Sequence, residues 1–188
     1  MIVATGFILL MQAGFALIES GTVSEKNSRN ILIKNMFDMS IGALAFWAMG
    51  YGFAFGQTGD KGGFIGDDTN LFFSSGFESK GVEADHYSEW NFQFACAATA
   101  ITIVSGSLAE RTRLPAYFLF SFLMTGFIYP VVVSWTWGGG FLAEKGFTDH
   151  SGCGIVHMVG GVAGFVGAAV VGPRHGKEKD PSKKKDVT

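Results

Sequence analysis

The sequence predicts an all-α integral membrane protein with five transmembrane helices. Its mean hydropathy is positive, at +0.29, and only 16% of its residues are charged, against about 25% in ordinary soluble domains. Five apolar stretches come close to the roughly 20 residues that a helix needs to cross the hydrocarbon core. They cover residues 2–18, 31–55, 92–108, 114–137 and 152–171. This pattern excludes a soluble globular domain.

The first span, residues 2–18, lacks the basic segment that precedes the apolar part of a secretory signal. It is short and starts at the first residue, so we expect the natural helix to begin earlier. A segment rich in glycine and hydroxyl groups follows Glu19 and can end the helix. Ser24, Asn27 or Ser28 could then cap the second helix.

The second span, residues 31–55, carries Lys34 and Asp38 near its start. Residues four apart lie on one face of a helix, so an ion pair between them is reasonable. A lysine whose long side chain reaches toward the interface is the other possibility. In either case we expect a structural role rather than a role in transport.

The third and fourth spans show different packing signals. Residues 92–108 are rich in alanine, serine and threonine, which suit close packing and hydrogen bonds between helices. In residues 114–137, Pro130 is expected to kink the helix. Trp135 and Trp137 lie at its outer end, where they could form part of an aromatic belt or attract a cation to the indole face.

The fifth span, residues 152–171, contains His157 in an otherwise apolar stretch. An ionisable residue is costly in a bilayer and usually faces a cavity or the bundle interior, so His157 suggests a path for an ion, proton or substrate. A buried hydrogen bond between helices is the alternative. The pairs Gly160/Gly164 and Ala163/Gly167 predict close approach of a neighbouring helix.

Basic residues are distributed unevenly between the two sets of loops that five spans define. One set holds three of them, Lys61, Lys80 and Lys145. The other set, with the start of the second span, holds eleven: Lys26, Arg29, Lys34, Arg111, Arg113, Arg174, Lys177, Lys179, Lys183, Lys184 and Lys185. The positive-inside rule therefore predicts an outside N-terminus and a cytoplasmic C-terminal tail. The charged residues are divided by sign between the two sides of the membrane, so the net charge of −2 does not predict a nucleic-acid-binding surface.

We expect one membrane domain, residues 1–172, followed by a basic cytoplasmic tail or linker, residues 173–188. Cys96 and Cys153 both fall in predicted spans and should be buried free thiols rather than a disulfide. Neither zinc nor calcium ligand spacing occurs in the sequence. No nucleophile, base and orienting group form a credible arrangement, so we expect no metal, no cofactor and no enzymatic activity.

Several stretches occur in one order along almost the whole chain: residues 10–21, the Lys-Asn pairs at 26–27 and 34–35, 104–106 with 109–111, 137–140, and 149–161. Together they resemble the ammonium transporter family (Amt/Mep/Rh), particularly its Amt branch. The resemblance implies an eleven-span fold of two inverted five-span repeats and a last helix, assembled as a homotrimer with one pore per subunit. This chain resembles the first repeat, which implies a partial transporter, truncated at both ends.

The resemblance also assigns roles by position. Trp137 matches the tryptophan of the family's outer recruitment site, Phe92 an aromatic residue of that site, and Asp149 the aspartate that supports it. His157 matches the first of two facing pore histidines, and the second would lie in a later span. Cys96 occupies the position of a phenylalanine that helps to close the outer pore, so gating by an aromatic ring is in doubt here.

The function implied is ammonium transport across a cell membrane. The long outer loop carries seven acidic residues, Asp60, Asp67, Asp68, Glu78, Glu83, Asp85 and Glu89. Ammonium would be attracted to this acidic outer face and to Trp137, lose its proton, and cross as ammonia past the pore histidines, because desolvating the whole cation is costly. Asp149 by itself suits a helix N-terminus, so we expect it to order the helix start rather than to contact ammonium. The alternative is an ammonium sensor that binds without significant flux and signals through a cytoplasmic module or regulatory protein.

Overall fold

The computed structural model describes residues 1–57, 63–77 and 83–174, and in these ranges it is all-helical, without strands. Five helical segments are long and apolar enough to cross a membrane: Ile2–Thr22, Glu25–Phe55, His86–Leu108, Leu114–Trp135 and Cys153–Val171. All five predicted spans are therefore confirmed. The second and third start earlier than predicted because polar residues continue the helix beyond the apolar stretch. The expected tail lies mostly outside the described residues.

The spans divide into shorter elements where their hydrogen-bond pattern changes. In chain order the elements are α1 (Ile2–Thr22), α2 (Glu25–Ala45), η1 (Phe46–Gly50), α3 (Tyr51–Phe55), η2 (Phe72–Ser74), α4 (Glu83–Leu108), α5 (Leu114–Leu123), η3 (Met124–Ile128), α6 (Tyr129–Trp135), α7 (Phe141–Glu144), η4 (Cys153–His157) and α8 (Met158–Val171). Of these, η1, η3 and η4 are π-helical turns, and η2 is a short 3₁₀ turn.

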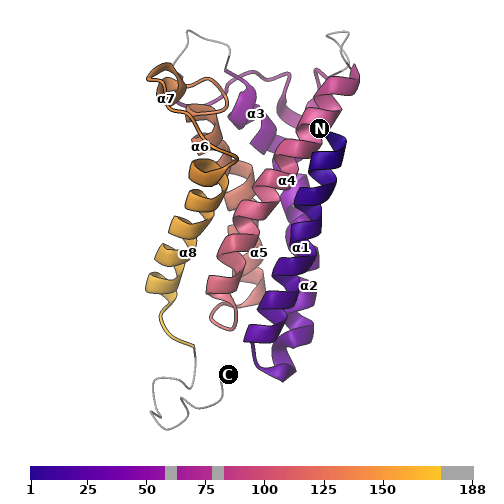
Figure 1. Cartoon of the computed structure of the whole chain (residues 1–188), viewed down its shortest axis with the longest axis vertical. Coiled ribbons are helices and arrows are strands. Elements are labelled where there is room, and N and C mark those ends of the chain that lie inside the picture. The colour runs from indigo at the N-terminus through magenta and orange to yellow at the C-terminus, as the bar shows by residue number, and fades with distance from the viewer. Residues whose placement is uncertain (58–62, 78–82, 175–188) are drawn as a thin grey trace.

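Helix α4 lies at the centre of the bundle, with α1 and α2 on one side and α8 on the other (Figure 1). Its small side chains, among them Ala97 and Ala100, are fully buried and let the neighbouring helices approach closely. Gln12 of α1 donates a hydrogen bond to Thr99 Oγ1 over 3.2 Å and accepts one from Thr102 Oγ1 over 2.6 Å. The predicted interhelical hydrogen bonds of the third span are thereby confirmed.

Helix α8 packs against α4 through its glycines. A Cβ atom added at Gly160 would lie 2.7 Å from the Ala100 carbonyl oxygen, and one at Gly164 would lie 2.8 Å from Ser107 Oγ. Both distances are too short for a side chain. The predicted close approach at these small residues is therefore confirmed, and α4 is the helix they contact.

The fourth span is irregular immediately before Pro130. This proline has no N–H to donate to the carbonyl of Gly126, one turn earlier, and its ring would crowd that carbonyl in a regular helix. The wider π turn η3 precedes α6 and relieves this crowding. A second π turn, η1, packs against η3, and a Cβ atom at Gly50 would lie 2.7 Å from the Thr125 carbonyl oxygen.

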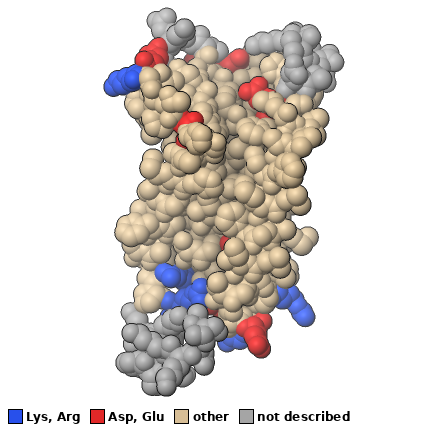
Figure 2. Space-filling view, viewed as in Figure 1, with Lys and Arg blue, Asp and Glu red and all other residues tan. Residues whose placement is uncertain are grey.

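The two ends of the bundle differ in charge. Most of the visible Lys and Arg side chains gather at the end that holds the α1–α2 and α4–α5 connections, which we call the basic end (Figure 2). Between the ends, a broad band of the visible face is nearly free of charged side chains, as expected of a surface that contacts lipid chains. We expect the basic end to face the cytoplasm.

Candidate functional site

Asp149 caps the π turn η4, which leads into α8. Its carboxylate accepts hydrogen bonds from the backbone N–H groups of Gly152, over 2.5 Å, and Gly154, over 2.7 Å. These groups start the helical segment and lack partners within it. Gly152 has a φ of +83°, which favours glycine and turns the chain tightly into η4. The expectation that Asp149 orders the helix start is confirmed.

Trp137 lies beside the same turn. It follows α6, is half-buried, and its Cη2 atom would lie 3.7 Å from a Cβ atom added at Gly152. Trp137 and Asp149 therefore meet at Gly152, although twelve positions separate them in the sequence. Trp135 has a different role, because its Nε1 donates to the Phe64 carbonyl oxygen over 2.8 Å and so joins α6 to the segment between α3 and η2.

Phe92 and Cys96 lie one helical turn apart on α4. Phe92 is half-buried against the hydrophobic core, and Cys96 is buried within it. Phe94 is turned toward other rings: it stacks on Trp90 with centroids 5.5 Å apart and also contacts Phe46. Phe94 therefore does not substitute for the aromatic ring that the family resemblance would place at position 96.

His157 is the last residue of η4 and lies on the side of the η4–α8 segment that turns away from α4. Its neighbours Ile155 and Val156 are buried, whereas His157 and Met158 are exposed. Among the described residues, none donates to or accepts from the imidazole. The open face continues along α8, where a Cβ atom at Gly161 would meet nothing within 4 Å. The sequence left two interpretations of His157 open, a path through the membrane and a buried hydrogen bond between helices. The second is wrong for the described residues, because the side chain is exposed and none of them bonds to it.

The two cysteines differ in exposure. Both are free thiols, as predicted, and Cys96 is buried. The prediction that Cys153 is buried is wrong, because it lies at the start of η4 and is exposed, as is His157 four residues later. A position within an apolar span does not say which side of the helix faces the core.

A buried polar network lies toward the basic end, and sequence reasoning missed it. Lys34 Nζ forms an ion pair with Glu19 Oε2 over 3.1 Å and donates to Ser105 Oγ over 2.7 Å and to the Ser105 carbonyl oxygen over 3.2 Å. Asn35 also donates to Glu19 Oε2, over 3.1 Å, and Ser105 Oγ donates to the other carboxylate oxygen. These contacts join α1, α2 and α4.

Neither alternative expected for Lys34 is found: it does not pair with Asp38, and it is buried instead of reaching toward the interface. Helical side chains point back toward the N-terminus of their helix, which directs Lys34 to Glu19 at the end of α1. Asp38 instead accepts a hydrogen bond from the Tyr117 hydroxyl of α5 over 2.6 Å. The lysine ammonium lies 4.7 Å from the centroid of the Tyr117 ring. Glu19 follows the end of the first predicted span and Lys34 lies near the start of the second. The two residues are therefore expected at a similar depth in the membrane, which could have identified Glu19 as the partner.

Glu110 joins three segments at the basic end. It accepts hydrogen bonds from Ser24, on both its amide and hydroxyl groups, and from Asn27 Nδ2 over 2.7 Å. Arg174, just after α8, forms an ion pair with it over 3.0 Å. Partial burial alone would raise the pKa of Glu110, but these hydrogen bonds and the Arg174 charge outweigh it and lower the pKa to about 2.

Comparison with known proteins connects this arrangement to one family. The sequence profile of the Ammonium Transporter Family matches residues 1–188. Ammonium transporter Amt1 of Haloferax mediterranei is 43% identical over 187 residues, covering 94% of this chain and 35% of that protein. Ammonium transporter 1 member 3 of Solanum lycopersicum is 41% identical over 181 residues, covering 90% of this chain and 37% of that protein.

Solved structures agree. A structure titled Sensor Amt Protein superposes with a TM-score of 0.84 at 36% identity, covering 92% of this chain and 43% of that one. Saccharomyces cerevisiae Mep2 superposes with a TM-score of 0.78 at 26% identity, covering 89% of this chain and 40% of that one. The chain thus spans about two fifths of the length of the relatives it matches.

Proposed function

The chain belongs to the ammonium transporter family, and from this premise we propose that it forms the first half of a path that carries ammonium nitrogen across a cell membrane. The observation that carries the proposal is the placement of His157. Its imidazole lies on an open helix face, in the turn that Asp149 caps and that lies beside Trp137. A histidine whose imidazole has no partner among the described residues is what a path shared with a second half requires.

The steps follow from the polarity of the residues along the path. Trp137 and Phe92 offer aromatic faces that attract a cation. Moving the intact cation through the apolar bundle would be costly, so ammonium gives its proton to water at the entrance. The ammonia that remains passes His157, whose nitrogens can donate or accept a hydrogen bond. Asp149 acts indirectly, by holding the turn that presents His157. Cys96 leaves the entrance without the ring that closes it in other family members.

Uptake of labelled methylammonium by cells that lack their own ammonium transporters tests this path. The natural gene product carrying this sequence is expressed as wild type, as His157→Ala and as His150→Ala. His150 is exposed in the loop before η4 and serves as the matched control. We expect His157→Ala to lower uptake at least about tenfold, which corresponds to about 1.4 kcal/mol in the barrier, and His150→Ala to leave it unchanged. Normal uptake by His157→Ala at equal expression would refute the pore role.

A second candidate function is an ammonium sensor that binds without significant flux. The similarity to a protein titled Sensor Amt Protein, together with Cys96 at the entrance, favours keeping this candidate. Calorimetric ammonium binding with no current in proteoliposomes would support the sensor, and a current carried by ammonium would support the transporter. In both cases we propose that the complete protein is a homotrimer, with the basic end facing the cytoplasm and available to a regulatory protein.

A further inference from the structure

Three ionisable side chains are buried together near the basic end, and their formal charges do not cancel. Glu19, Lys34 and Asp38 are 4%, 4% and 1% exposed. The positively charged Lys34 side chain neutralises one carboxylate, so two ionised carboxylates would leave a net charge of −1 inside the bundle. A single uncompensated charge is strongly disfavoured in a low-dielectric interior. The cluster therefore needs one more positive charge.

The two carboxylates are not equivalent. Glu19 accepts hydrogen bonds from Lys34, Asn35 and Ser105, which favour its ionised form. Asp38 accepts one, from Tyr117, and its other oxygen, Oδ1, is buried without a hydrogen-bond partner. The additional positive charge that the cluster needs is therefore expected at Asp38 and not at Glu19.

The Asp38 carboxyl group has a further polar neighbour in Ser121. Ser121, one helical turn after Tyr117 on α5, faces the same carboxyl group, and its hydroxyl is also buried without a hydrogen-bond partner. A carboxylic acid O–H could donate to this oxygen. A metal ion fits poorly, because it would need several more oxygen ligands, and the described residues contain no group of three metal-ligating side chains.

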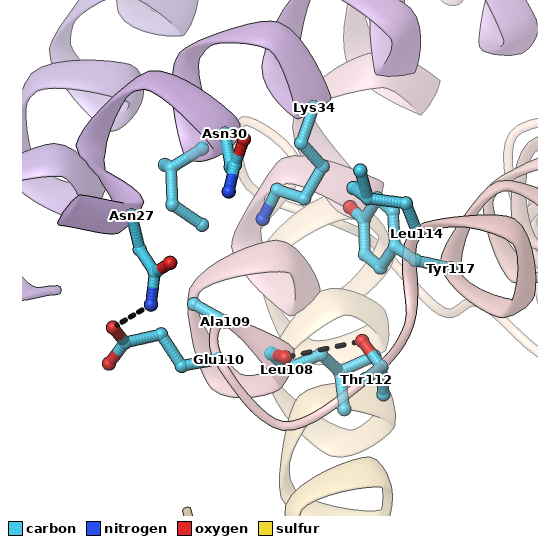
Figure 3. Close-up of a pocket in the computed structure, with 10 residues that line it drawn as sticks. Asn27, Asn30, Lys34, Leu108, Ala109, Glu110, Thr112, Leu114 and Tyr117 are labelled. Carbon is cyan, nitrogen blue, oxygen red and sulfur yellow. Dashed lines mark hydrogen bonds between the residues drawn. The ribbon is translucent and has the colours of Figure 1, made fainter. Parts of the chain in front are cut away.

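A cavity connects this region with the basic end. It has a volume of about 190 Å³, enough for several water molecules, and is lined by Asn27, Asn30, Lys34 and Tyr117 among others. Figure 3 shows Asn27 and Glu110 on one side of the cavity and Lys34 and Tyr117 on the other. Tyr117 lines this cavity and also contacts Asp38 through its hydroxyl, so this residue connects the carboxyl group with the water-accessible space.

We propose that Asp38 is a proton-binding site that exchanges with water at the basic end through Tyr117 and this cavity. In the binding step, Tyr117 gives its hydroxyl proton to Asp38 Oδ2, the oxygen it contacts, and takes one from a hydronium ion in the cavity, which leaves water. Rotation of the carboxyl group then turns the new O–H toward Ser121. The charged or titratable groups packed around Asp38 are Lys34 on its own helix, Glu19 on α1 and Tyr117 on α5, while α4 contributes the uncharged Ser105. The site is separate from His157 and does not depend on ammonium transport.

Infrared spectroscopy of the complete chain in lipid nanodiscs tests the proposal. We expect a carbonyl band of a protonated carboxylic acid at neutral pH, a shift of this band in D₂O, and its loss in Asp38→Asn. Glu110→Gln is the matched control, because the low pKa of Glu110 keeps that side chain ionised at neutral pH. Selective ¹³C labelling of the aspartate carboxyl groups should shift the band in the wild-type chain, which makes the assignment independent of any variant.

Two further variants test the route. Asn30→Trp, at an exposed residue of the cavity wall, should slow the D₂O shift several-fold, and Tyr117→Phe should slow it as well. The absence of a carboxylic acid band at neutral pH, its survival in Asp38→Asn, or its failure to move with ¹³C-aspartate would overturn the proton site. Unchanged exchange rates in both route variants would overturn the proposed access through Tyr117.

Discussion

Replacing Lys34 by methionine removes the only positive charge in the buried network that joins α1, α2 and α4 among the described residues. Glu19 then remains ionised and buried with hydrogen bonds from Asn35 and Ser105 alone, or takes up a proton at a free-energy cost. Breaking a buried ion pair by removing one partner costs about 3–5 kcal/mol. We expect Lys34→Met to lower the free energy of unfolding by an amount in this range.

The double variant Lys34→Met/Glu19→Gln separates the lost charge balance from lost packing. It removes both charges and retains side chains of similar size, and such neutral replacements of buried pairs are often close to neutral in stability. We therefore expect the double variant to recover more than half of the loss. Lys26→Met, an exposed lysine on the same helix, should change the free energy of unfolding by less than about 0.5 kcal/mol.

Unfolding in mixed micelles with increasing SDS, followed by far-ultraviolet circular dichroism, measures these differences. A loss below about 1 kcal/mol in Lys34→Met, the value expected of an exposed pair, would show that this buried ion pair does not stabilise the chain as expected. A double variant as unstable as the single one would refute the charge-balance reasoning, because packing rather than the uncompensated carboxylate would then account for the loss.

Three further predictions use the same measurement. Gly164→Val should destabilise the chain by about 1–3 kcal/mol, because the new Cβ would lie 2.8 Å from Ser107 Oγ. Gly161→Val, whose Cβ would lie in open space, should not destabilise it. Equal effects of the two variants would contradict the α8–α4 packing. Asp149→Ala should cost about 1 kcal/mol through the lost cap, and no change would mean that the cap is dispensable. Glu110 has a pKa of about 2 in the folded chain against an ordinary value of 4.5. Its stabilising contribution is therefore complete above about pH 4.5 and is lost as the pH falls toward 2. Glu110→Gln should weaken this pH dependence, and an unchanged pH profile would refute the role of Glu110.

The spans could be predicted because bilayer thickness imposes a minimum apolar length on each one. Their exact ends could not, since polar residues such as Glu25 and His86 continue a helix once its apolar part has formed. The cap by Asp149 was predictable for a local reason: a carboxylate a few residues before a helix is close to backbone N–H groups whatever the rest of the fold does.

Contacts between residues far apart in the sequence were harder to predict. The sequence places Lys34 next to Asp38, but the lysine pairs with Glu19 from another helix, which comes within reach only when α1 and α2 pack side by side. The exposure of Cys153 was mispredicted for a related reason. Hydropathy reports that a segment is apolar and does not report which of its sides meets α4.

The sequence by itself determined the number of membrane spans, the glycine face of α8, the intramembrane histidine and the family to which the chain is related. These properties depend on local composition and on residue types at short spacing. The tertiary structure alone decided that Trp137 and Asp149 meet at Gly152, that Lys34 pairs with Glu19, and that Asp38 retains an unpartnered oxygen beside Tyr117. Each of these contacts joins different elements, so it exists only after the packing of α4 with its neighbours has brought them within a few ångströms.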